Sequence, residues 1–322
     1  MTPSRPPFDP ELEPVVLAYS RLFPRLGPDT LTQLRALTSE GVPGQEPMDY
    51  TVGGSVVVED LAIVRPDGTE LVVTVLRPRD APPDLLGILH VHGGGMVMGT
   101  RMFGVDTYLP YVVEGHAVIV TVEYRLAPEH PDPAPVEDCY AALTWMGKAA
   151  GDLGVDGSRL MVVGASAGGG LAAGAVLMAR DRGFPAVSHQ ILDCPMLDDR
   201  LQTHSSRMLD NDGPWDQHDN IFGWNALLGE RRGGRDVSYY AAPARAEELS
   251  GLPRTYLSCG SVDSFRDEVL DFALKLSQAG VLVDLHIWGG AFHGFDLAAQ
   301  NTAVAQASMR TRDEFVRRII RE

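Results

Sequence analysis

A serine flanked by small residues is the first candidate for chemistry, and it lies in the pentapeptide GASAG at 164–168. The run 160–163 before it is apolar and the run 169–175 after it holds small residues, so the pattern predicts a strand, a sharp turn and a helix. Such a turn needs glycines because its backbone is strained and crowded, and the helix N-terminus favours developing negative charge. We interpret Ser166 as a nucleophile; the alternative is a glycine-rich turn with an incidental serine.

A second glycine-rich segment, HGGG at 92–95, follows the predicted strand 87–92. Successive glycines let the backbone turn its N–H groups toward a substrate oxygen, as an oxyanion hole requires. The N–H groups of Gly94 and Gly95, together with that of Ala167, are the candidate donors. We expect His92 to brace this loop rather than to transfer protons. A phosphate-binding loop is a poor alternative, because neither GxGxxG nor GKS/T occurs here.

A nucleophilic serine needs a base, and in the fold that such a turn suggests the base comes last along the chain. His293 lies in the glycine-rich segment 289–295, which we predict to be a loop just past the strand 283–288. His286 falls within that strand, where a structural role is expected. His293 is therefore the candidate base.

The base must in turn be oriented by an acid that lies past the penultimate strand. Asp263 follows the predicted strand 254–259 and is our candidate. Asp267 and Glu268 fall in the first turn of the next helix, where acidic residues complement the helix dipole, and we interpret them so. Asp296 follows the base too closely to orient it easily.

The elements that must position these residues alternate between strand and helix. Periodicity predicts two short N-terminal helices and a hairpin, followed by βα units whose apolar, β-branched strands indicate a sheet covered on both faces. The predicted class is thus α/β, with a mostly parallel, doubly wound sheet of about eight strands and antiparallel strands at one edge. The expected helices are 11–22, 30–38, 136–150, 167–182, 266–279 and 302–320; the expected strands are 56–64, 71–77, 87–92, 117–123, 160–163, 190–194, 254–259 and 283–288.

About 60 residues between the strands ending at 194 and beginning at 254 break this alternation. A structureless loop of that length is implausible in a compact domain, so we predict a helical insertion that packs with the N-terminal helices as a cap. The approximate division is an N-terminal cap segment 1–50, a catalytic domain 51–196 plus 250–322, and a cap insertion 197–249. Large apolar residues of the insertion are candidates for the substrate pocket or, equally, for the core of the cap: Met208, Leu209, Trp215, Phe222 and Trp224.

Composition excludes several classes of function. The net charge is −16, from 27 basic and 43 acidic residues, which disfavours nucleic acid and anionic membranes. Three cysteines without a CxxC pair give neither a disulfide framework nor a zinc signature, so we expect buried thiols, no metal and no cofactor. The N-terminus lacks a signal-like apolar region and no run reaches 18 apolar residues, so we expect a cytoplasmic protein without membrane insertion.

The spaced set of motifs from about residue 45 onward resembles the bacterial hormone-sensitive-lipase-like (family IV) esterases of the α/β-hydrolase superfamily. The segments that carry the resemblance are HGGG (92–95), YRLAPEHP (124–131), GASAGG (164–169), PMLDDR (195–200), DSFRDE (263–268) and FHGF (292–295). The resemblance implies the same nucleophile, acid, base and oxyanion donors, a cap, and cofactor-free hydrolysis of short- to medium-chain acyl esters. It also suggests a homodimer, since many members of this family form dimers.

One position departs from the family pattern. Ala165 stands where relatives usually carry Asp or Thr before the nucleophile, so we expect altered tuning rather than lost activity. The sequence leaves other functions open. An amidase, deacetylase or peptidase could use the same three residues, and a non-catalytic ligand receptor could use the same fold. The retained Ser166, Asp263 and His293 argue against the receptor.

Overall fold

The strands at the centre of the protein are apolar along their whole length. The computed structural model describes residues 3–40 and 48–322. Every residue of β3 (Leu85–Val91) and of β4 (Ala117–Val122) is buried, as in a sheet with both faces covered. Among the described residues the eight strands form one sheet in the order β1-β2-β4-β3-β5-β6-β7-β8. The remaining strands are β1 (Val56–Val64), β2 (Glu70–Pro78), β5 (Val155–Ala165), β6 (His189–Asp193), β7 (Arg254–Val262) and β8 (Val283–Phe292).

The sheet is mixed, as the sequence predicts. β1 pairs antiparallel with β2, and β2 pairs antiparallel with β4, so the predicted hairpin forms one edge. From β4 through β8 all neighbours are parallel, which brings their carboxyl ends to one side of the sheet. Ligand sites of open parallel sheets lie at that side.

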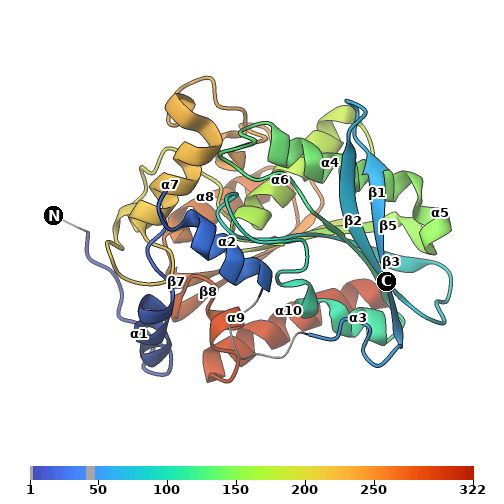
Figure 1. Ribbon diagram of the computed structural model, residues 1–322, viewed down its shortest axis with the longest axis horizontal. Coiled ribbons are helices and arrows are strands. Elements are labelled where there is room, and N and C mark those ends of the chain that lie inside the picture. Colours follow the sequence, from blue (N-terminus) through green and yellow to red (C-terminus); the bar gives the residue numbers. More distant parts are fainter. Residues whose placement is uncertain (1–2, 41–47) are drawn as a thin grey trace.

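Helices cover both faces of the sheet (Figure 1). Leu89 and Val91 pack on one face with the layer that holds α4 and α6, whereas Leu86 and Ile88 pack on the other with α3 and α10. This period of two is the geometry of a strand buried on both sides. The main helices are α3 (Leu109–Val113), α4 (Ala134–Lys148), α5 (Ala150–Leu153), α6 (Ala167–Arg182), α7 (Gln217–Leu228), α8 (Arg266–Gln278), α9 (Phe295–Ala298) and α10 (Ala303–Arg321).

The chain between the two N-terminal helices contacts the 197–249 region. The helices are α1 (Glu13–Leu22) and α2 (Leu31–Glu40), close to the predicted bounds, and Val16 of α1 packs in a cluster with Phe292 and Phe295. The Arg25 guanidinium contacts Asp216 at 3.1 Å, and the Leu26 N–H donates to Asp219 at 3.2 Å. These contacts join the two segments predicted to form a cap, although the boundaries of that cap stay a prediction. Among the described residues, no helix combines the length and apolar character needed to cross a bilayer.

Candidate active site

The predicted strand–turn–helix around Ser166 is present and tightly packed. β5 ends at Ala165, α6 begins at Ala167, and Ser166 between them has a φ of 58°, in the left-handed region. A Cβ on Gly164 would lie 2.3 Å from the Gly168 carbonyl oxygen, and one on Gly168 would lie 2.2 Å from the Val91 oxygen. Only glycine fits at these two positions, so the flanking glycines allow the turn that presents the serine.

Three side chains from three strand ends meet at this turn. His293 Nε2 lies 2.9 Å from Ser166 Oγ, and His293 Nδ1 lies 2.9 Å from Asp263 Oδ2. Asp263 follows β7 directly and His293 follows β8 directly, so the parallel strands deliver both residues to the same edge as Ser166. The Asp263 side chain is fully buried, and the His293 side chain is 11% exposed. This is the hydrogen-bonded arrangement of nucleophile, base and orienting acid.

The surroundings of His293 decide its protonation. A carboxylate only accepts hydrogen bonds, so Nδ1 carries the proton toward Asp263 and Nε2 offers its lone pair to Ser166. Burial lowers the pKa of the imidazole, whereas the Asp263 carboxylate, which accepts the Nδ1 proton, raises it. The other oxygen of Asp263 accepts the Phe265 N–H at 2.9 Å, which fixes the carboxylate.

The three predicted oxyanion donors lie on the two segments that surround the serine. Gly94 and Gly95 have φ of 116° and 62°, which favours glycine, and Ala167 occupies the first turn of α6. Within residues 3–40 and 48–322, the N–H groups of these three residues make no hydrogen bond to the protein. Their N–H groups are therefore free to donate to a ligand.

His92 braces the glycine loop, as predicted. Its ring is fully buried and stacks on Tyr124 with centroids 4.1 Å apart, and the Tyr124 hydroxyl donates to the His92 carbonyl oxygen. His92 Nδ1 lies 2.7 Å from the Gly93 carbonyl oxygen. Burial lowers the pKa of His92 to about 4, so the ring is neutral at neutral pH. These contacts hold the loop that carries Gly94 and Gly95.

The predicted pocket residues do not all lie together. Trp215 packs against the glycine loop, since a Cβ on Gly95 would lie 2.3 Å from its indole, and its ring centroid is 6.1 Å from that of His293. Met208 and Leu209 cluster instead with Val262 and Phe8. Trp224 shares the main hydrophobic core with Trp215, and Phe222 packs against that core.

Two sequence interpretations were incomplete. Glu268 lies in the first turn of α8, as expected, but it is buried and accepts the Leu197 N–H at 2.7 Å and the Asp198 N–H at 3.3 Å. It therefore supports the chain after β6 rather than merely the helix dipole. The segment 289–295 was predicted to be a loop, yet β8 continues to Phe292. The reason is a bulge in β8: the three residues between Trp288 and Phe292 face the one between Gly260 and Val262, and pairing resumes at Phe292 beyond the two glycines.

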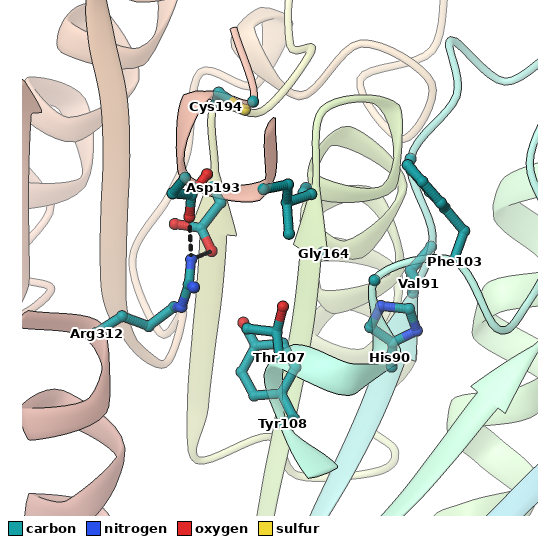
Figure 2. Close-up of a pocket in the computed structure, with 15 residues that line it drawn as sticks. His90, Val91, Phe103, Thr107, Tyr108, Gly164, Asp193, Cys194 and Arg312 are labelled. Atoms are coloured by element: carbon teal, nitrogen blue, oxygen red, sulfur yellow. Dashed lines mark hydrogen bonds and ion pairs between the residues drawn. The ribbon is translucent and has the colours of Figure 1, made fainter. Parts of the chain in front are cut away.

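An ion cluster beneath the site was not predicted (Figure 2). Arg312 of α10 donates from one Nη to Asp193 at 2.9 Å and to Asp296 at 2.7 Å, and all three side chains are nearly buried. Asp193 ends β6, and Asp296 lies three residues after His293. The cluster thus ties the segment after the histidine to the sheet. It borders a cavity that Ala165 also lines.

The fold is that of an α/β-hydrolase, and comparison with known proteins agrees. A family model described as the alpha/beta hydrolase fold matches residues 88–297. Carboxylesterase NlhH of Mycobacterium tuberculosis is 36% identical over 255 residues, which cover 75% of this chain and 76% of that protein. The solved structure of a bacterial heroin esterase is 38% identical, with a TM-score of 0.88 over 97% of this chain and 99% of that one. Bovine hormone-sensitive lipase is 36% identical over 110 residues, 34% of this chain and 15% of the lipase.

The chain belongs to this α/β-hydrolase family, within its hormone-sensitive-lipase-like (family IV) esterases. It is a carboxylic ester hydrolase.

Proposed function

We propose that this esterase hydrolyses short- to medium-chain acyl esters through an acyl-enzyme on Ser166, with His293 as base and Asp263 as orienting acid. One observation carries the proposal: the two ring nitrogens of His293 each lie 2.9 Å from a partner, Ser166 Oγ on one side and Asp263 Oδ2 on the other. A single imidazole can therefore take the serine proton while its opposite side is stabilised by negative charge.

The reaction follows from these contacts. Ser166 Oγ attacks the ester carbonyl carbon as His293 Nε2 takes its proton, and the tetrahedral oxyanion accepts hydrogen bonds from the N–H groups of Gly94, Gly95 and Ala167. His293 then protonates the leaving alcohol, which leaves an acyl group on Ser166. Water attacks this acyl-enzyme with His293 again as base, and the carboxylic acid is released.

The nucleophile assignment is tested with Ser166→Ala and p-nitrophenyl butyrate. We expect turnover to fall on the order of 10⁶-fold, the loss seen when a comparable triad loses its serine. Circular dichroism checks that the variant is folded. Activity retained within tenfold of the parent would refute the assignment. Matched ester and amide substrates test the amidase, deacetylase and peptidase alternatives, because we expect the parent enzyme to prefer the ester.

Trp215 is the candidate pocket residue with the best support, and we propose that its side chain limits the length of the acyl chain. Its indole packs on Gly95 and lies near His293, so a long acyl chain would meet it. Trp215→Ala should move the optimum of a p-nitrophenyl ester series to longer chains. Trp145→Ala is the control, since Trp145 packs against the main core from α4 and is not a candidate pocket residue, and it should leave the optimum unchanged.

A homodimer is the second part of the proposal, with β8 at its interface. Within the described residues β8 is one of the two edge strands of the sheet, Leu282 directly before it is 70% exposed, and Leu274 of α8 is 58% exposed. Exposed edges and apolar patches favour pairing between chains. Leu282→Asp should shift the sedimentation of a dimer to that of a monomer. Val64→Asp, on the opposite edge strand and 72% exposed, is the control. The cytoplasmic location stays a prediction.

A further inference from the structure

Cys194 is a buried thiol beside the proposed base and acid, and the esterase mechanism does not use it. It directly follows β6, with φ of 37°, and its N–H donates to the Ser258 carbonyl oxygen on β7. One ligand atom each from Cys194, Asp263 and His293 can be chosen so that all three lie within 4.8 Å of one another. Figure 2 shows Cys194 at the upper edge of the cavity, next to Asp193.

The three donor types match one class of metal ion. A thiolate, an imidazole and a carboxylate are the ligands of Zn²⁺ and of softer divalent ions, whereas Mg²⁺ and Ca²⁺ prefer oxygen throughout. Ligand atoms around a tetrahedral zinc lie roughly 3.3–3.8 Å apart, so side-chain shifts of about 1 Å would close this site. Water can supply the fourth ligand. A second small cavity, lined by Cys194 and Cys259 and by the neighbours of His293, borders the thiol.

We propose that Cys194, His293 and Asp263 form an inhibitory site for Zn²⁺ and similar thiophilic divalent cations. The inhibition would follow from the single lone pair of a neutral imidazole. When the metal binds Nδ1, it takes the place of the Nδ1 proton, and that proton moves to Nε2. The thiol loses its own proton to solvent and binds as thiolate, so the metal holds one thiolate, one carboxylate and one neutral imidazole.

The consequence for catalysis is the same whichever ring nitrogen binds the metal. With the metal on Nδ1, Nε2 becomes a donor and can no longer accept the Ser166 proton. With the metal on Nε2, the accepting lone pair is itself occupied. This inhibitory consequence rests on the proposed role of His293 as base, whereas the existence of the metal site does not.

A second cluster of possible metal ligands offers a competing explanation for inhibition by a metal ion. Asp216, His218 and Asp219 also place ligand atoms within 4.8 Å of one another, but without sulfur. Asp216 already accepts the His218 and Asp219 N–H groups as the N-cap of α7 and pairs with Arg25, so its carboxylate is engaged. A metal bound here would not require Cys194 and would not give a thiolate absorption band. His218→Ala therefore separates the two clusters.

The test uses the full-length enzyme stripped of metal with a chelator and then titrated with ZnCl₂, CoCl₂ or MgCl₂. Turnover of p-nitrophenyl butyrate is expressed relative to each variant's own metal-free rate. Zn²⁺ should inhibit the parent and the chelator should restore activity, while Mg²⁺ should not inhibit. Cys194→Ala should raise the Zn²⁺ concentration for half-inhibition by at least roughly 10- to 100-fold, the loss that altering even an outer-shell partner produces. Cys139→Ala, which removes a buried thiol of α4, should leave it unchanged.

Cobalt gives a readout that does not depend on activity. Co²⁺ bound to a thiolate has a near-ultraviolet charge-transfer band, which should appear in the parent and in His218→Ala and be missing in Cys194→Ala. The proposal is overturned if the parent shows no such band, if Cys194→Ala keeps the band, or if His218→Ala alone abolishes inhibition. A Cys194-dependent band without loss of turnover would instead overturn the inhibitory role and count against His293 as base.

Discussion

The buried cluster of Arg312, Asp193 and Asp296 makes the sharpest prediction about stability. Replacing Arg312 by Met keeps the apolar stem but removes the guanidinium that both carboxylates contact, at 2.9 and 2.7 Å. The side chains of Arg312, Asp193 and Asp296 are 8%, 12% and 11% exposed, so water cannot replace the guanidinium well. Removing one partner of a buried ion pair costs about 3–5 kcal/mol, because a buried charge is left uncompensated.

The assay is urea denaturation followed by fluorescence, with the free energy of unfolding as the readout. Arg312→Met should lose about 3–5 kcal/mol. Combining it with Asp193→Asn and Asp296→Asn should recover a large part of that loss, because no uncompensated charge remains. Arg310→Met, on an exposed position of the same helix, should change stability by no more than about 0.5 kcal/mol. A loss below about 1 kcal/mol for Arg312→Met, the value of an exposed pair, would refute the reasoning.

Three further predictions concern protonation and the glycine loop. Burial raises the pKa of Asp193 to about 6, with Arg312 opposing the shift, so the folded state binds this proton more tightly than the unfolded chain. Its contribution is therefore present at low pH and lost as pH rises, and stability relative to Asp193→Asn should fall by about 3 kcal/mol between roughly pH 4 and pH 7. Asp263→Asn should lower kcat on the order of 10⁴-fold and move the acidic limb of the pH–rate profile to lower pH, because the anion that raises the pKa of His293 is gone. Gly95→Ala should lower kcat by roughly 10²–10³, the effect of losing one oxyanion donor, because its Cβ would meet the Trp215 ring.

Each of these has an outcome that contradicts it. A stability difference that does not vary with pH would mean that Asp193 titrates normally in the folded protein. An unmoved acidic limb in Asp263→Asn would mean that this carboxylate does not set the pKa of His293. The control for Gly95→Ala is Gly157→Ala. The new Cβ would lie 3.6 Å from the Ala150 Cβ, which is ordinary van der Waals contact. Equal activity of the two alanine variants would exclude a role for the glycine loop.

Local pattern was enough to predict the sheet and the residues that meet in the site. The strands are continuously apolar, and the two glycine-rich turns follow apolar runs directly, so both the elements and their order could be inferred. Asp263 and His293 follow their strands immediately, and parallel pairing then brings them together with Ser166. The distances between them had no signal in the sequence.

Contacts that depend on packing between distant segments could not be predicted. Arg312 reads as an ordinary helix residue, and its partner Asp193 lies 119 positions away. Glu268 was interpreted as complementing the helix dipole. Its hydrogen bond to the distant Leu197 N–H depends on tertiary packing and has no signal in the sequence. The end of β8 was misplaced because its glycines suggest a loop, whereas they lie in a bulge of β8 after which Phe292 pairs again with Val262 of β7.

The central claim is that Ser166 becomes covalently acylated. Incubation with a fluorophosphonate ester, followed by proteolysis and mass spectrometry, identifies the modified residue directly. We expect one adduct per chain, on the peptide that contains Ser166, with no adduct in Ser166→Ala and much slower labelling in His293→Ala. Labelling of another residue in the parent enzyme, or undiminished labelling in Ser166→Ala, would contradict it.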